Sequence, residues 1–283
     1  MRFNKFSEID SICKKYNLEN YTINSDGSVD VDGDVDLRGI GFWNYFYGEK
    51  KTLSNKWTLN KLGEKKENKW TLNKLPLKFR YVSGDFDCRF NNLSDLQGCP
   101  TKIEGSLYLY HNKLKSLEGC PDEVDRLLIS DNELESLRGC PKRVRGDFNC
   151  SNNKLTSLEF SPNWVGGYFS ITDNPVTDPK GFPNKINSSI SWKNTPLSKL
   201  VSLLVDNECG CPDLGCSLIT GNHSQNWKLI CEVIDMINQY DVVDGNDLNI
   251  TNLQRLYYDM IDEYDMYPKR LPKDIEVEGY NTI

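Results

Sequence analysis

Four side chains near the C-terminus are of the kinds that bind zinc. Cys209, Cys211 and Cys216 are followed by His223, and thiolate and imidazole groups are the usual zinc ligands. Structural zinc sites commonly pair their cysteines as C-x-x-C, and this segment contains no such pair. We therefore expect no bound metal, and we keep a zinc-binding or enzymatic C-terminal region as an alternative hypothesis.

The other residues that could do chemistry do not form a catalytic set. The 283-residue chain has only two histidines, His111 and His223, which restricts acid–base catalysis by imidazole. It contains no nucleophile–base–orienter pattern and no glycine-rich phosphate loop. Residues 28–34 resemble part of a calcium loop, but Gly39 stands where a bidentate Glu is needed, and strand alternation explains the valines equally well. We expect a protein that is not an enzyme and needs no cofactor.

A basic, aromatic segment at residues 38–75 is a second candidate site. It holds nine Lys or Arg and three Asp or Glu, a charge of 9 − 3 = +6, in a chain whose net charge is −7. Basic residues interleaved with aromatic ones suit single-stranded nucleic acid, an anionic surface or an acidic protein. The alternative is a looped insertion whose aromatic side chains pack on the edge of the fold. The candidate binding residues of this insertion are Trp43, Tyr45, Phe46, Tyr47 and Trp57.

The middle of the chain is a repeat of 20 or 21 residues, and its units must position the candidate side chains. Its five units start at Gly84, Gly105, Asp125, Gly146 and Gly167. Apolar residues follow each start at two and four positions, an asparagine at seven, Leu or Val at nine and a proline at sixteen. The alternation predicts a short strand with one buried face. The Gly-Cys-Pro stretches exclude a helix on the return side, which we expect to be extended.

Stretches such as residues 146–158 and 117–121 resemble the leucine-rich repeat family in its short bacterial and phage-type form. The sequence pattern of these stretches is most similar to that of leucine-rich-repeat proteins of large tailed phages. The resemblance implies an α+β repeat solenoid: a right-handed coil with a parallel concave β-sheet and an extended, non-helical convex side. It also implies a protein-binding role. We therefore expect a phage-encoded protein that acts on a host protein, such as one of the host's defence proteins.

The two ends of the chain depart from the repeat. Residues 1–37 predict a helix, with Ser7 as its N-cap, followed by a hairpin around Asp26-Gly27, together a small α/β N-terminal cap. Residues 38–75 form the insertion and residues 76–195 the repeats. Residues 196–283 carry six Lys or Arg and fifteen Asp or Glu. Helices starting near Pro196, Ser224 and Thr251 and a small hairpin predict an α-rich, acidic C-terminal cap.

The outward positions of the predicted strands form the main candidate binding surface, since alternate residues of a strand point to opposite faces. Tyr and Arg at the centre of this face are the residue types that dominate protein interfaces. An ordinary solvated sheet face is the alternative. The candidate residues of this concave face are Asp85, Asp87, Arg89, Tyr108, Tyr110, Arg126, Leu128, Asp147, Asn149 and Tyr168.

The chain has no run of 18 apolar residues and no secretory signal at its start, so we expect a cytoplasmic protein without a membrane span. In a reducing compartment its ten cysteines would be free thiols. Because cysteine recurs in fixed repeat columns, we expect it to be a small core residue.

Overall fold

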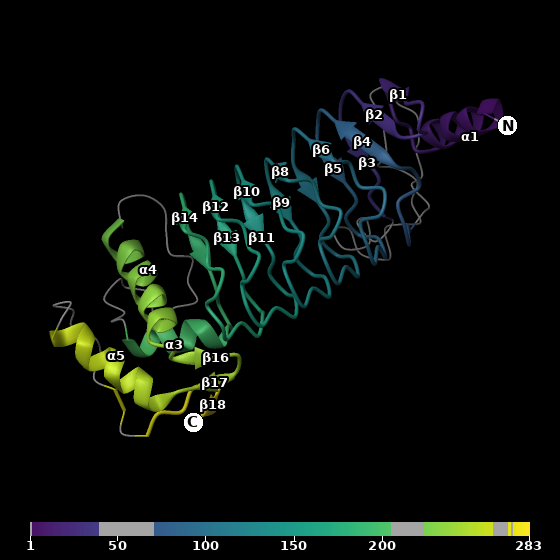
Figure 1. Ribbon diagram of the computed structural model, residues 1–283. Coiled ribbons are helices and arrows are strands. Elements are labelled where there is room, and N and C mark those ends of the chain that lie inside the picture. The colour runs from purple at the N-terminus through teal and green to yellow at the C-terminus, as the bar shows by residue number, and fades with distance from the viewer. Residues whose placement is uncertain (1, 40–70, 205–223, 263–270, 273) are drawn as a thin grey trace, which may run out of the picture. The chain divides into compact units, whose positions relative to one another are not determined.

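A computed structural model describes residues 2–39, 71–204, 224–262, 271–272 and 274–283 (Figure 1). The chain forms two compact units, Met1–Glu133 and Leu134–Ile283, and each is described by itself. Most of the predicted insertion lies outside the described residues. None of the described helices has the length and apolar character needed to cross a membrane.

The first unit begins with a helix and a hairpin, as predicted. Helix α1 spans Arg2–Lys15, and strands β1 (Tyr21–Ile23) and β2 (Val29–Val31) pair antiparallel. Gly27 at the turn has a φ of 85°, a conformation that glycine adopts without strain. The N-cap expected at Ser7 is wrong, because the helix already begins at Arg2 and Ser7 lies inside it.

The rest of the first unit is a stack of repeat turns joined by two parallel ladders of very short strands. One ladder contains β3 (Val35–Asp36), β5 (Phe86–Asp87), β7 (Leu107–Tyr108) and β9 (Leu127–Leu128). The other contains β2, β4 (Phe79–Val82) and β6 (Lys102–Ile103), with β8 (Glu123–Val124) in the next turn. Figure 1 shows these strands as short arrows lying side by side.

The register of the first ladder confirms the predicted repeat. Phe86 pairs with Leu107, and Leu107 pairs with Leu127, so equivalent residues of successive turns lie next to each other. These three side chains are fully buried inside the turns. Because each turn buries its apolar residues against its neighbours, the turns depend on one another for stability. The return side is extended, as predicted, but the second ladder on that side was not anticipated.

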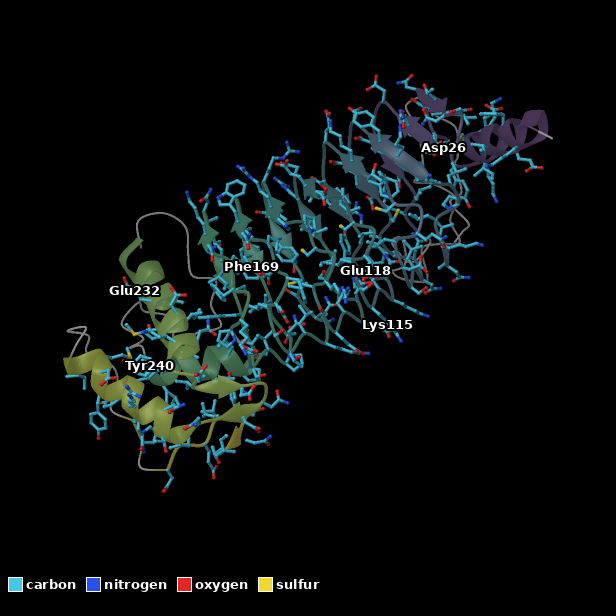
Figure 2. The ribbon with its side chains drawn as sticks, viewed as in Figure 1. Asp26, Lys115, Glu118, Phe169, Glu232 and Tyr240 are labelled. Atoms are coloured by element: carbon cyan, nitrogen blue, oxygen red, sulfur yellow. The ribbon has the colours of Figure 1, made fainter. Side chains whose placement is uncertain are left out.

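The second unit continues the same pattern. Strands β10 (Arg143–Val144), β12 (Trp164–Val165) and β14 (Lys185–Ile186) form one parallel ladder. Strands β11 (Phe148–Asn149), β13 (Phe169–Ser170) and β15 (Ile190–Ser191) form the other. Inside the turns Phe169, labelled in Figure 2, stacks on Phe148 with ring centroids 5.3 Å apart. Successive strands of each ladder thus follow one another at the same spacing of 20 to 21 residues as the sequence repeat.

An α-rich segment follows the last turn, as predicted. It contains α3 (Pro196–Leu204), α4 (Ser224–Gln239), the antiparallel strands β16 (Val243–Asp244) and β17 (Asp247–Leu248), and α5 (Ile250–Asp262). The hydroxyl of Tyr240 donates a hydrogen bond of 2.7 Å to Asp259 and so joins the end of α4 to α5 (Figure 2). Strand β18 (Asn281–Thr282) pairs parallel with β17, a pairing that the sequence pattern did not indicate.

Candidate functional site

The strand face is the outward side of β3, β5, β7 and β9 and of the residues that directly follow these strands. Its position follows from alternation: Phe86 and Cys88 are fully buried, while Asp87 and Arg89 between and after them are only partly buried. The structure brings together six residues of this face, which we name the Arg–Tyr cluster. They are Asp36, Arg38, Asp87, Arg89, Tyr108 and Tyr110.

Arg89 is the centre of the cluster. Its guanidinium carbon lies 5.2 Å from the ring centroid of Tyr108 and 5.1 Å from that of Tyr110. The guanidinium also donates a hydrogen bond to the hydroxyl of Tyr110. Contact with two electron-rich ring faces holds the cation in place. Arg89 and the two tyrosines therefore form a preorganised group of the residue types that carry most binding energy at protein interfaces.

Asp87 compensates the charge of this arginine. Its carboxylate accepts hydrogen bonds of 2.9 and 3.0 Å from Nε of Arg89, and Oδ2 lies 3.7 Å from Nε of Arg38. The Asp87 side chain is 14% exposed. The loss of water around the carboxylate raises its pKa by more than the two arginines lower it, and the pKa rises to about 6. The protonation state of the cluster thus changes within a physiological pH range.

A second ion pair lies on the preceding turn. Arg38 donates hydrogen bonds of 2.8 and 2.5 Å to the two carboxylate oxygens of Asp36. Desolvation alone would raise the pKa of Asp36. The hydrogen bonds and the charge interaction with Arg38 have a larger combined effect, so the pKa is lowered. Neither Asp36 nor Arg38 was predicted to belong to the site. Val35 and Leu37 already indicated a strand there, and strand alternation could have placed them outward.

An aromatic neighbour of the cluster adopts a strained backbone. Phe90 has a φ of 59°, and every later turn has His, Asp or Asn at the equivalent position, also with positive φ. A left-handed conformation is unfavourable for a bulky side chain. Phe90 is buried against Tyr110 and His111, with ring centroids 5.4 and 4.5 Å away. The strain is therefore located beside the Arg–Tyr cluster.

Two predicted site residues accept hydrogen bonds from the backbone of the next turn. The carboxylate of Asp85 accepts a 2.7 Å hydrogen bond from the N–H of Ser106, and in the second unit Asp147 accepts one of 2.9 Å from the N–H of Tyr168. These acceptors satisfy N–H groups at the corner between the two ladders. Their role in joining turns could not be read from outward orientation alone.

The other predicted residues of the strand face lie around these groups. Leu128 pairs in register with Tyr108 on the neighbouring strand, and Arg126 is exposed. In the second unit Asn149 accepts a 3.0 Å hydrogen bond from the N–H of Ser151, and Tyr168 is partly buried.

The three aspartates of residues 28–34 each contact a different residue. Asp30 pairs with Arg80, Asp32 accepts from the Ser83 hydroxyl and Asp34 accepts from the N–H of Asp85. Each carboxylate thus has a partner in the next turn, which favours the strand interpretation. In the part of the chain that the structure describes, no three His, Cys, Asp or Glu side chains are grouped as metal ligands.

Nine predicted site residues fall outside the described residues. These are Cys209, Cys211, Cys216 and His223 near the C-terminus and Trp43, Tyr45, Phe46, Tyr47 and Trp57 in the insertion.

Three of the described repeat cysteines are core residues, as predicted, whereas Cys120 and Cys140 are only partly buried. Cys88 and Cys150 are fully buried free thiols, and Cys99 is 6% exposed. Burial raises the pKa of Cys99 to about 12 and that of Cys88 and Cys150 well above the ordinary value. A protonated, buried thiol is a poor nucleophile, so these cysteines act as small apolar side chains.

Comparisons of this chain with protein-family models, with curated proteins and with solved structures gave no match.

Proposed function

We propose that this chain is a non-catalytic, protein-binding solenoid whose partner contacts the Arg–Tyr cluster on the strand face. The observation that carries the proposal is Arg89, held by two tyrosine rings and by Asp87. Tyr and Arg are the residue types most enriched among interface hot spots. Their side chains are already ordered, so little conformational entropy is lost when a partner binds.

The charges of the cluster indicate the chemistry of the partner. Arg38 and Arg89 are each paired with a carboxylate, Asp36 and Asp87. A highly charged partner would have to break these pairs, whereas a surface of mixed apolar and hydrogen-bonding groups would not. We therefore propose a protein surface with apolar and neutral polar groups. The family resemblance is the reason for proposing a bacterial host protein as its source.

The test is capture of the partner by affinity-tagged protein from a bacterial lysate, followed by quantitative mass spectrometry. Replacing Arg89, Tyr108 and Tyr110 by Ala should reduce the captured partner by about tenfold or more, because truncation of a hot-spot residue commonly costs at least 2 kcal/mol. Tyr81→Ala is a matched control. Tyr81 also contacts a cation, Lys102 at 5.3 Å, but it lies on the other ladder.

Equal thermal stability of the two variants would show that any loss of capture reflects the face and not the fold. Equal capture by the wild type and the triple variant would exclude the Arg–Tyr cluster as the binding surface.

A further inference from the structure

The second ladder of the second unit has one flank without any acidic residue. We define this basic flank as residues 139–145, 160–166 and 181–187, which lead into and include β10, β12 and β14. It contains three Lys or Arg in the first stretch and one in the third, a charge of 3 + 0 + 1 = +4. The three equivalent stretches of the first unit, 77–83, 98–104 and 119–124, contain three Lys or Arg and three Asp or Glu, a charge of 3 − 3 = 0. The second unit thus carries a positive charge on this flank that the equivalent stretches of the first unit do not carry.

A row of three side chains crosses the basic flank. Arg143 pairs in register with Trp164, and Trp164 pairs in register with Lys185. The guanidinium carbon of Arg143 lies 4.2 Å from the Trp164 ring. Arg143 and Lys185 are exposed and Trp164 is partly buried. An arginine stacked on an aromatic ring keeps its N–H groups available at the edge, where they can bind an anion.

The indole of Trp164 lies over Gly166, two residues later in the chain. A Cβ on Gly166 would lie 1.9 Å from the carbonyl oxygen of Arg145 and 2.8 Å from Cη2 of Trp164, so the backbone of the preceding turn and the indole both approach this glycine closely. The indole therefore lies along its own strand, over Gly166 and next to Arg143. A flat, supported ring suits stacking against another flat group more than insertion into a lipid layer.

Phe160 is a second aromatic residue on the same turn, and nothing in the repeat requires it. Four other turns have glycine at this position, Gly98, Gly119, Gly139 and Gly181, each with a positive φ. Phe160 has a φ of 68° there, and its side chain is 52% exposed. Neither the backbone nor burial of the ring favours this residue. Strain of this kind commonly marks a site where the side chain is used.

From this combination we infer that the basic flank binds single-stranded nucleic acid. Bases stack on Phe160 and Trp164, while Lys142, Arg143 and Lys185 contact phosphates. Cations interleaved with aromatic faces are the arrangement by which proteins bind single strands without reading their sequence. An acidic peptide would use the same cations, but it gives no role to an exposed, strained phenylalanine. The site is independent of the Arg–Tyr cluster and of the predicted insertion.

The test is fluorescence anisotropy of the full chain with a fluorescein-labelled thymidine oligonucleotide of about 20 nucleotides at low salt. Three phosphate contacts predict a slope of about −2 for log K against log salt, so raising the salt tenfold should weaken binding about 100-fold. Double-stranded DNA of the same length should bind more weakly at equal salt, because its bases are not available for stacking.

Phe160→Gly is the decisive variant, because it restores the residue of the other turns. It should leave the midpoint of urea unfolding equal or higher, while affinity for the oligonucleotide falls about tenfold. Arg143→Ala with Lys185→Ala should reduce affinity and make the salt slope shallower. Lys102→Ala, on the equivalent flank of the first unit, is the control and should bind as the wild type does.

Three results would overturn the inference: absence of binding at low salt, binding that Phe160→Gly and the double variant leave unchanged, or equal binding of poly-glutamate or of anionic phospholipid vesicles. A loss of stability in Phe160→Gly would assign this side chain a structural role. None of these results bears on capture of a protein by the strand face, which uses other residues.

Discussion

The side-chain oxygen of Asn112 accepts a hydrogen bond of 3.0 Å from the backbone N–H of Leu93, nineteen positions earlier. The amide nitrogen of the same asparagine donates to the carbonyl of Cys88 in the earlier turn at 3.0 Å and to that of Leu109 in its own turn at 2.9 Å. Asn112 is 8% exposed. One buried amide therefore joins two turns through both of its polar atoms.

Replacing Asn112 by Ala should lower the free energy of unfolding by about 3 kcal/mol, because the buried N–H of Leu93 would lose its acceptor. The two carbonyls would each keep a second amide donor, Asn91 for Cys88 and Asn132 for Leu109. Urea unfolding measures the change. Lys113→Ala, at the exposed neighbouring position, should alter the free energy by less than about 0.5 kcal/mol. An equally small effect of Asn112→Ala would contradict a structural role for the amide.

Glycine and aspartate are coupled across successive turns. A Cβ on Gly105 would lie 2.5 Å from Oδ1 of Asp85, which reaches over it to accept from the N–H of Ser106. The next turn has Ser106 in place of the aspartate, and there the glycine position is occupied by Asp125. Gly105→Asp should therefore destabilise the wild type by about 2–3 kcal/mol.

The same change should cost at least about 1 kcal/mol less in an Asp85→Ser background, which reproduces the pair found in the next turn. A double-mutant cycle by urea unfolding measures this coupling. Strictly additive effects would show that the backbone of Gly84, and not the aspartate, excludes the side chain.

Thr195 ends the repeat by taking the place of its asparagine. Its hydroxyl donates to the carbonyl of Trp192 at 2.8 Å and accepts from the N–H of Ser198 at 3.1 Å, so it is the N-cap of α3. Thr195→Val keeps the shape and removes the hydroxyl, and should cost about 1 kcal/mol. Thr195→Ser keeps the cap and should cost less. Hydrogen exchange at the amide of Ser198 should be faster in the valine variant alone, and equal exchange in both variants would argue against capping.

Asp87 should make stability depend on pH in the direction opposite to most carboxylates. Its pKa rises from 3.8 to about 6 on folding. Below about pH 4 both states carry the proton, whereas between about pH 4 and 6 only the folded state keeps it, so stability falls as the pH rises. The shift corresponds to a contribution of about 3 kcal/mol to the free energy of unfolding, which is present below about pH 4 and fully lost above about pH 6.

Asp87→Asn removes this titration while leaving the other carboxylates in place. The difference in unfolding free energy, wild type minus variant, should fall by about 3 kcal/mol between about pH 4 and 7. Urea titrations at several pH values measure the difference. A constant difference would mean that Arg89 and Arg38 balance the desolvation of this carboxylate.

The sequence by itself determined the strands of the ladder that contains β5 and β7, their buried side chains and the end of the repeat. The alternation around Phe86 and Cys88 and the recurring asparagine are local, periodic signals, because burial on one side of a strand requires an apolar residue at every second position. The start of a helix at Thr195-Pro196 was also a local signal, because proline is favoured at the first position of a helix.

Only the tertiary structure decided which side chains meet. Arg38 reaches Asp87, Asp85 turns to the backbone of Ser106, and β18 joins β17. Stacking brings residues from different turns together, so contacts between them depend on the register of whole turns and not on neighbouring letters. Charge and orientation could be predicted for each residue, but its partner was set by the turn stacked against it.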